Sequence, residues 1–483
     1  MVYPSPDEAC QIRQIVFRNT TELARLDSEV ARAQAVVERL SKQQAETRKC
    51  VEIHESLLSP IRKLPPELLA EIFLCSLRAE VFLIPNANLV PLVLLKVCRI
   101  WRTIALGTPQ LWSSLRIDHA GGNRIWAVEN WLSRSGDCPL SLSSSCQTLC
   151  TATRAVELIG RYLHRWQHVK IDFPEGYDRN LCLPSPSSSL APHLTTIDLT
   201  CSGRTVAPAV ARQIWIVLAS APNLRSVSCD IDPFPPDFQF PWSNLQKLSL
   251  LVDVSMDNCL ELLKQCPNVV ECGFSSLKLA SDVREKSPIF LGQLRSLMVA
   301  TGLNLAPFFD RLCTPALEEL AIESFPDTLA GYPVWSQSAL LDMLCRSSCP
   351  LSKLHFYFVE LSPDSLIACL QATESNLTEL TIQSPFGFGL CVNDIVLRLL
   401  THRNDDEFRC LSPKLKVLTL LSCISCLEGA FADMVESRWR DISSSSNSPV
   451  AQLQVVELRD FRTREDIRRL KKMAKEGLTV NFD

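Results

Sequence analysis

Beyond about residue 160, a motif of three apolar residues spaced as Leu-x-x-Leu-x-Leu recurs ten times. The copies are Leu194/Ile197/Leu199, Leu224/Val227/Cys229, Leu245/Leu248/Leu250, Val269/Cys272/Phe274, Leu294/Leu297/Val299, Leu317/Leu320/Ile322, Leu351/Leu354/Phe356, Leu377/Leu380/Ile382, Leu415/Leu418/Leu420 and Leu453/Val456/Leu458. From Leu224 to Leu317 the first residues are spaced by 21, 24, 25 and 23 positions, and the step reaches 38 after Leu377. Such a step predicts a stack of similar structural units, each burying its apolar face against its neighbours.

Helix signals lie between the copies and end in a common way. The stretch 209–218 ends at Ala221-Pro222-Asn223-Leu224, and 259–264 ends at Cys266-Pro267-Asn268-Val269. Proline stops a helix and favours extended backbone in the residue before it. Ser362-Pro363 opens a further helix, in the order of an N-cap and a first turn. A strand followed by a helix, repeated, predicts right-handed βα units and a parallel sheet.

This pattern resembles the leucine-rich repeat, whose period is about 20–29 residues. The resemblance implies an α/β solenoid with parallel strands on a concave side and helices outside. The family's regular repeat places Cys or Asn three positions after its third leucine, and here only Cys423 fits directly. We therefore expect irregular curvature. Ser-rich stretches at 185–189 and 443–446 are predicted surface insertions.

The last part of the chain reads as a terminal cap. Ile467, Leu470 and Met473 predict a helix, and the alternation from Leu478 to Phe482 predicts a last strand. We interpret the basic residues of this region as a solvated charged face, since acidic residues partly offset them. They are Arg462, Arg464, Arg468, Arg469, Lys471, Lys472 and Lys475.

Residues between the repeat leucines should line the exposed face of the strands, because side chains alternate along a strand. In the middle copies, Leu320 and Ile322 should point into the core. The candidate target-binding residues of these copies are Glu319, Glu323, Lys353, His355, Tyr357 and Glu379. Their charges favour a target with a basic or mixed-charge segment, with Tyr357 as an aromatic anchor.

A second motif lies upstream of the repeats. Leu64-Pro65-Pro66-Glu67-Leu68-Leu69 precedes Ile72-Phe73, and Val97-Cys98-Arg99-Ile100-Trp101-Arg102 follows about thirty residues later. The two prolines suit the first turn of a helix, and the apolar residues after them fall on one helical face. Two short helices cannot bury so much apolar surface between themselves, so the remaining face should find a partner.

This segment resembles the F-box over residues 59–115, and Ile104-Ala105, Pro109 and Leu111-Trp112 follow in the family's order. The resemblance implies binding to the Skp adaptor, which links a receptor to a cullin. The adaptor-binding residues that it implies are Leu64, Pro65, Pro66, Leu68, Leu69, Ile72, Phe73, Val97, Cys98, Trp101 and Ile104. The spacer Val81–Pro85 is longer than in compact family members, and a helical pair packed on the downstream domain is the alternative.

Residues 21–55 predict an amphipathic helix capped by Thr20 or Thr21. Its apolar stripe, with steps of three and four, is Leu23, Leu26, Val30, Ala33, Val37 and Leu40. The pattern decays at Gln44 and Thr47 and partly resumes at Val51, which leaves fewer than three clean heptads. A homodimer through this helix and a single helix packed on its own protein both fit the pattern.

Catalytic and metal-binding patterns are weak. Cys423-Ile424-Ser425-Cys426 lacks the second cysteine pair of a zinc site, and His164 and His168 have no Glu between them. No Gly-x-Ser-x-Gly elbow, P-loop or dinucleotide fingerprint occurs. We therefore expect no catalytic residues, no metal and no cofactor.

Composition narrows the partners and the compartment. The net charge of −4 argues against nucleic-acid binding. No apolar run is long enough for a membrane span, and the N-terminus lacks the apolar core of a signal peptide, so we expect no membrane partner. The 21 cysteines then read as reduced thiols in a cytoplasmic or nuclear protein.

The predicted organisation is an N-terminal helix at 1–58, an F-box at 59–115, a linker or first cap at 116–160, and repeats with a C-terminal cap at 161–483. The two resemblances imply a non-catalytic substrate-recognition subunit of a Skp–cullin–F-box ubiquitin ligase. In that role the F-box holds the adaptor and the repeats hold a target protein. The alternative is a repeat scaffold that acts outside a ligase.

Overall fold

The structure is a computed structural model of the 483-residue chain. It describes residues 5–77, 81–118, 125–145, 149–173, 191–201, 206–231, 242–278, 287–326, 335–384, 390–403, 410–443 and 450–482. The chain divides into two compact units, Met1–Cys75 and Ser76–Asp483, so the boundary falls inside the predicted F-box segment. The predicted Ser-rich insertions lie outside the described residues, except for Ser443 at the end of a helix.

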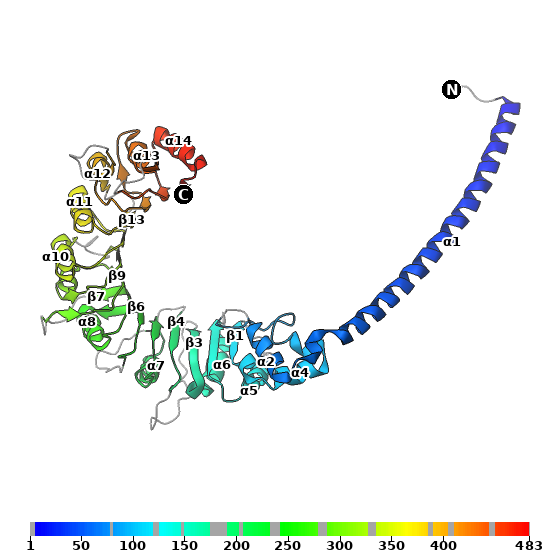
Figure 1. Ribbon diagram of the computed structural model, residues 1–483, viewed down its shortest axis with the longest axis horizontal. Coiled ribbons are helices and arrows are strands. Elements are labelled where there is room, and N and C mark those ends of the chain that lie inside the picture. The colour runs from blue at the N-terminus through cyan, green and yellow to red at the C-terminus, as the bar shows by residue number, and fades with distance from the viewer. Residues whose placement is uncertain are drawn as a thin grey trace. The chain divides into compact units, whose positions relative to one another are not determined.

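The first unit consists of a long helix followed by two short ones. Helix α1 (Pro6–Leu58) is longer than predicted and is gently curved (Figure 1). Ser5 and Glu8 form its capping box, in which the Ser5 N–H donates to Glu8 Oε2 over 2.8 Å. The predicted cap at Thr20 or Thr21 is wrong. Both threonines lie inside α1 and donate to carbonyl oxygens one turn earlier, because the polar segment upstream brings its own cap.

After α1, a 3-10 helix η1 (Pro60–Lys63) leads into α2 (Pro66–Cys75). The second unit begins with α3 (Leu94–Val97), α4 (Arg99–Leu106) and the 3-10 helix η2 (Pro109–Trp112). Its other helices are α5 (Ile125–Arg134), α6 (Leu149–Arg161), η3 (Leu163–Arg165), α7 (Pro208–Ala219), α8 (Met256–Gln265), α9 (Ala306–Phe309), α10 (Gln337–Ser347), α11 (Pro363–Ala372), α12 (Asp394–Leu400), α13 (Ala430–Ser443) and α14 (Arg464–Lys475).

A parallel sheet of 14 strands runs through the second unit and does not close on itself. Its strands in order are β1 (Ser114–Asp118), β2 (Leu140–Ser145), β3 (Trp166–Phe173), β4 (Thr196–Cys201), β5 (Ser226–Cys229), β6 (Lys247–Ser255), β7 (Glu271–Lys278), β9 (Ser296–Thr301), β11 (Glu319–Ser324), β12 (Lys353–Tyr357), β13 (Glu379–Gln383), β15 (Val417–Leu421), β17 (Val455–Arg459) and β18 (Thr479–Phe482). Two small sheets pair β8 (Ile289–Phe290) with β10 (Leu312–Cys313) and β14 (Val392–Asn393) with β16 (Ile424–Ser425). The predicted α/β class and parallel sheet are confirmed.

Each of the ten predicted motif copies coincides with one strand of this sheet, from β4 to β17. Consecutive copies align in register, so their second leucines form a column across neighbouring strands. Leu320 and Ile322 are buried, as predicted. Figure 1 shows α8, α10 and α11 on one side of the sheet. The apolar column and the apolar residues of these helices are both buried.

The asparagine that precedes each of the strands β5, β6 and β7 has a role of its own. Asn223, Asn244 and Asn268 each donate a side-chain hydrogen bond to a carbonyl oxygen at the preceding junction, over 2.8, 3.4 and 2.7 Å. The acceptors are Pro192, Pro222 and Ser243 respectively. The asparagines therefore tie successive strand-helix units together at one edge.

The sheet begins earlier than the first motif copy. Strands β1 and β2 extend it into the segment 116–160, which was expected to be a linker or first cap. The spacer runs beside β1: the Arg116 N–H donates to the Leu83 carbonyl over 2.7 Å, and the Leu83 N–H to Ser114 Oγ over 2.9 Å. The spacer therefore covers the first edge of the sheet, where unpaired backbone groups would otherwise be exposed.

In the second unit, buried arginine side chains link neighbouring strand-helix repeats. Arg438 is fully buried and donates to the carbonyl oxygens of Leu400, Leu411 and Ser412 and to the Cys410 sulfur. Burial lowers its pKa, although the neighbouring Cys410 sulfur opposes that shift. Arg165 repeats the arrangement near the start of the sheet, donating to carbonyl oxygens at 135 and 138. No pattern in the sequence pointed to either arginine.

The cysteines whose side chains the structure describes are free thiols, and many are buried. Burial raises the pKa of the Cys266 and Cys369 thiols to about 12 and that of Cys259 well above its ordinary value. These side chains therefore act as small apolar residues of the core, because a protonated thiol is a poor nucleophile.

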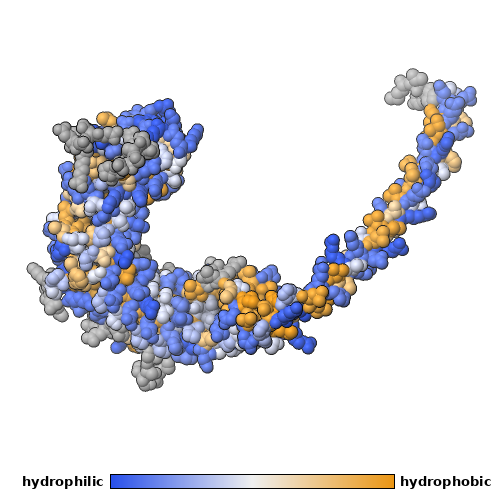
Figure 2. Space-filling view, viewed as in Figure 1, coloured by the Kyte–Doolittle hydropathy of each residue, from blue (hydrophilic) through white to orange (hydrophobic). Residues whose placement is uncertain are grey.

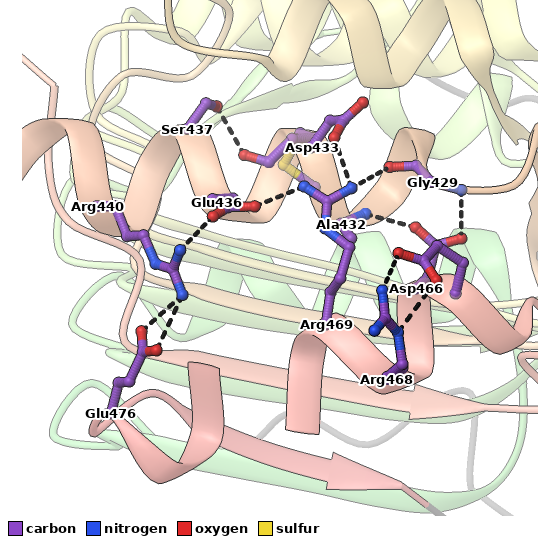
Figure 3. Close-up of polar contacts among 12 residues, drawn as sticks. Gly429, Ala432, Asp433, Glu436, Ser437, Arg440, Asp466, Arg468, Arg469 and Glu476 are labelled. Carbon is purple, nitrogen blue, oxygen red and sulfur yellow. Dashed lines mark hydrogen bonds and ion pairs between the residues drawn. The ribbon is translucent and has the colours of Figure 1, made fainter. Parts of the chain in front are cut away.

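The last helix and strand cap the sheet, as predicted, but their charges are not simply solvated. Figure 3 shows Arg469 of α14 reaching Asp433 and Glu436 of α13, and Arg440 of α13 reaching Glu476. Asp466 is fully buried and accepts hydrogen bonds from the Gly429 and Ala432 N–H groups at the start of α13. The interpretation of a solvated face therefore fails for Arg469, whereas Arg468 and the lysines of α14 are exposed.

Candidate binding surfaces

Helix α2 divides the predicted adaptor-binding residues between two faces. Leu69 and Phe73, four positions apart, are 3% and 1% exposed, whereas Leu68 and Ile72 on the neighbouring face are 51% and 43% exposed. Pro65 and Pro66 are exposed at the start of the helix, and Leu64 is half-buried. The helix is thus anchored by one apolar pair and presents the other to water.

Helices α3 and α4 carry the remaining predicted adaptor-binding residues. Val97 is 53% exposed at the end of α3, whereas Trp101 and Ile104 of α4 are half-buried. Cys98 is half-buried and has a structural role. It is the N-cap of α4, and its sulfur accepts the Trp101 N–H over 3.5 Å. Ile100, which the resemblance did not include, is the most exposed apolar side chain of α4, at 62%.

Trp112 attaches α4 to the sheet within the second unit. Its indole N–H donates to the Ala105 carbonyl over 2.8 Å, and its ring meets Trp131 edge-on at 4.9 Å between centroids. Arg134 lies over the same ring at 4.7 Å. Trp112 and Ala105 are fully buried, so this hydrogen bond joins α4 to η2, the segment directly before β1, inside the core. The predicted adaptor-binding residues Leu64–Phe73 lie in the first unit, and those of α3 and α4 lie in the second.

The predicted target-binding residues lie together on the exposed face of β11, β12 and β13. Lys353 pairs in register with Glu319 on one side and Glu379 on the other, and Tyr357 pairs with Glu323. Lys353 Nζ lies 3.5 Å from Glu379 Oε2. Three acidic, two basic or ionisable and one aromatic side chain therefore form one continuous patch, which we call the middle patch.

His355 is the centre of the middle patch. Its Nε2 lies 3.8 Å from Glu319 Oε1, and its ring stacks on Tyr357 with 6.2 Å between centroids and 7° between planes. Only 7% of the residue is exposed, and Nδ1 is buried without a hydrogen-bond partner among the described residues. Burial lowers the pKa of His355, while Glu379 and Glu319 oppose that shift. Burial also raises the pKa of Tyr357.

Ion pairs occur elsewhere on the same face. Lys170 meets Asp198 between β3 and β4, and Lys247 meets Glu271 between β6 and β7, each over 2.6 Å. A third pair joins Asp253 and Lys278 over 2.6 Å. Since acids and bases alternate across neighbouring strands, the face is compensated in charge and differs from the single-sign surface of a nucleic-acid binder.

A surface groove that the sequence did not predict lies near the carboxyl ends of β15 and β17. Ser422 and Asp460 follow β15 and β17 in the left-handed backbone region, with φ of 55° and 57°. The Ser422 hydroxyl donates to Asp460 Oδ2 over 2.6 Å and links the two turns. The groove is lined by Leu390, Ile424, Cys426, Phe461, Arg462 and Arg464, together with their polar neighbours. The only sequence signal is a polar residue directly after each strand.

The weak metal patterns do not assemble into a site. Cys423 is fully buried, and Cys426 lines the groove, where burial raises its pKa to about 11. His164 lies in η3, whereas His168 lies on β3 and is 3.0 Å from Ser141 Oγ. Among the described residues, no group of three or more His, Cys, Asp or Glu side chains could hold a metal ion.

Two further findings concern membrane-spanning helices and similarity to known proteins, and both are negative. In the part of the chain that the structure describes, no helix is both long and apolar enough to cross a membrane. No family model matches the sequence, and no curated protein matches it either.

Proposed function

We propose that this chain is a non-catalytic substrate receptor of a Skp–cullin–F-box ubiquitin ligase. In this role Leu64–Phe73 and Val97–Ile104 bind the Skp adaptor, and the large sheet binds a target protein. The receptor contributes proximity: it raises the effective concentration of target lysines near the ubiquitin-carrying subunit. It would act in the cytoplasm or the nucleus, in keeping with its free thiols.

One observation carries the adaptor part of the proposal. Leu68 and Ile72 stay exposed on α2 although Leu69 and Phe73 next to them are buried. An apolar pair at helical spacing that remains in water suits a docking surface for another protein. In the second unit, Val97 at the end of α3 and Ile100 in α4 are also exposed, at 53% and 62%.

We further propose that the 14-stranded sheet and its helices form a leucine-rich-repeat solenoid. Its support is the register of the ten motif copies and the asparagine bonds between successive junctions. A solenoid of this kind presents one long face of strands, and repeat proteins commonly bind partners along such faces. The middle patch is the target-binding surface that we favour.

Co-purification with the Skp adaptor and a cullin tests the proposal. In the full chain, Leu68→Glu with Ile72→Glu should abolish adaptor recovery, because two charges would have to be buried in the contact. Losing one buried Leu from such an interface typically changes the binding free energy by about 2 kcal/mol. Both side chains are exposed, so the fold should survive the change.

The matched control is Glu67→Lys with Glu71→Lys, which alters two exposed positions of the same helix. Recovery should persist in this control if the apolar pair makes the contact. Adaptor binding by a chain that lacks residues 59–115 would refute the assignment. Recovery of the adaptor without any cullin would favour a scaffold that acts outside a ligase.

A further inference from the structure

Helix α1 presents a row of apolar side chains that its own unit leaves uncovered. The helix has 53 residues and is therefore about 80 Å long. Apart from Ala9, its residues of described burial are exposed, and the large apolar side chains range from 43% exposure at Leu26 to 81% at Leu58. Figure 2 shows these apolar side chains recurring along the helix. Packing of an apolar face, more than intrinsic propensity, stabilises most helices, so this face calls for a partner.

Nine of the large apolar side chains of α1 fall in one heptad register that runs along the helix, whereas Ile15, Phe17, Val36, Ile53 and Leu57 lie outside it. Steps of three and four from the stripe Leu23–Leu40 reach Ala9 upstream and Leu58 downstream, about seven heptads, with polar residues at Asn19, Gln44, Thr47 and His54. The a positions are Ala9, Val16, Leu23, Val30, Val37, Gln44, Val51 and Leu58. The d positions are Ile12, Asn19, Leu26, Ala33, Leu40, Thr47 and His54.

We propose that α1 pairs with α1 of a second copy of this chain in a parallel two-stranded coiled coil. The choice of partner rests on the residues of the seam. Four of its a positions are β-branched valines, and Leu26 and Leu40 stand at d, the combination that favours two parallel strands. A seven-residue repeat held over this length also requires the two helices to supercoil around each other.

The polar seam positions support a second copy over an unrelated helix. In a parallel pair in register, every layer meets its own copy, so Asn19, Gln44 and Thr47 each face an identical side chain that can donate and accept hydrogen bonds. An apolar partner would leave the Asn19 and Gln44 amides unpaired, whereas the Thr47 hydroxyl already donates to the Gln43 carbonyl oxygen over 2.9 Å. One pair opposes the arrangement: Glu22 at g would face Asp27 at e of the other copy, although Arg25 already holds Glu22 at 2.7 Å.

Sedimentation of the full chain tests this proposal and does not depend on adaptor binding. Under reducing conditions, which keep the exposed Cys10 and Cys50 from cross-linking, the mass should be twice the 54.1 kDa of one chain at micromolar concentration. Val30→Glu with Val37→Glu places charges in the seam and should give the mass of one chain. Ala31→Glu with Ala45→Glu adds the same charge on the outward b positions and should leave the dimer intact.

Orientation has its own test. Asp27→Lys should strengthen the dimer, so that it forms at a lower protein concentration. The introduced ammonium group of one copy would face Glu22 of the other copy only in the parallel arrangement. A single-chain mass for the natural sequence at micromolar concentration would overturn the proposal. So would a dimer that survives the two seam charges, a mass of three or more chains, or a weaker dimer after Asp27→Lys.

Discussion

His355 combines burial and charge at a single residue of the middle patch. Its ring is only 7% exposed and stacks on Tyr357, yet Glu319 lies 3.8 Å away. Burial lowers its pKa, which means that the folded protein favours the neutral ring. Protonation of this one side chain is therefore coupled to the packing of three strands.

The first prediction concerns pH. Below an ordinary histidine pKa of about 6.5, His355 takes up a proton in the unfolded chain but resists it in the folded protein. The free energy of unfolding therefore decreases as the pH decreases. His355 thus contributes stability that is present above this pH and is lost as pH decreases through it. We expect the urea midpoint to fall more steeply from about pH 7.5 to pH 5.5 in the natural chain than in His355→Gln.

The control for this experiment is His164→Gln, which changes an exposed histidine in η3. It should retain the steeper pH dependence of the natural chain. If the midpoints of the natural chain and His355→Gln ran parallel over this range, the coupling between burial and protonation would be disproved.

At the scale of elements, α13 depends on a cap that another helix supplies. The Asp466 carboxylate of α14 accepts the Gly429 N–H over 2.9 Å and the Ala432 N–H over 2.6 Å. These are amide groups at a helix start, which have no partner within the helix. The carboxylate also lies at the positive end of the helix dipole. The last two helices are consequently one cooperative element.

The second prediction follows from this shared cap. Asp466→Ala should destabilise the protein by about 1–3 kcal/mol, because it removes a cap and leaves buried N–H groups unpaired. Hydrogen exchange should rise first in α13, α14 and β18. Glu465→Ala is the control, since that side chain is partly exposed and bonds Arg468 within its own helix. Equal exchange in the two variants would show that Asp466 is not the cap on which α13 depends.

The sequence predicted the ten strands from β4 to β17 because the spacing of their leucines is a local signal. It missed β1 and β2, which alternate apolar and polar residues but lack the first leucine of the motif. It also missed Asp466, Arg438 and the groove, because each depends on contacts between segments that are far apart in sequence. The middle patch was predictable from strand alternation, but the burial of His355 was not.

At the scale of the whole molecule, the two units supply different surfaces. The first offers an apolar pair on α2 and the seam of α1, and the second offers an open sheet with paired charges. The sheet pairs acids with bases along its length, so net charge alone does not distinguish the middle patch from the rest of the face. What distinguishes it is the stacked His355–Tyr357 pair among three glutamates.

The third prediction tests the middle patch as the target-binding surface. Reversing charge at Glu319, Glu323 and Glu379 together should reduce recovery of the target by at least about tenfold, which corresponds to about 1.4 kcal/mol. The matched control reverses Asp198, Asp253 and Glu271, which lie on the same face and also pair with lysines. Undiminished recovery by the first variant, folded and adaptor-bound, would move the target site away from the patch.

The buried thiols of the second unit can report local opening of its structure. Cys229, Cys259, Cys266 and Cys369 lie in different parts of the sheet and its helices, and burial keeps each one protonated. A small alkylating reagent would modify each thiol only when the strand-helix repeat around that thiol opens. The natural chain therefore contains a series of reporters of local opening, without any introduced label. The order in which the thiols are alkylated, read by peptide mass, would trace how an opening spreads along the stack.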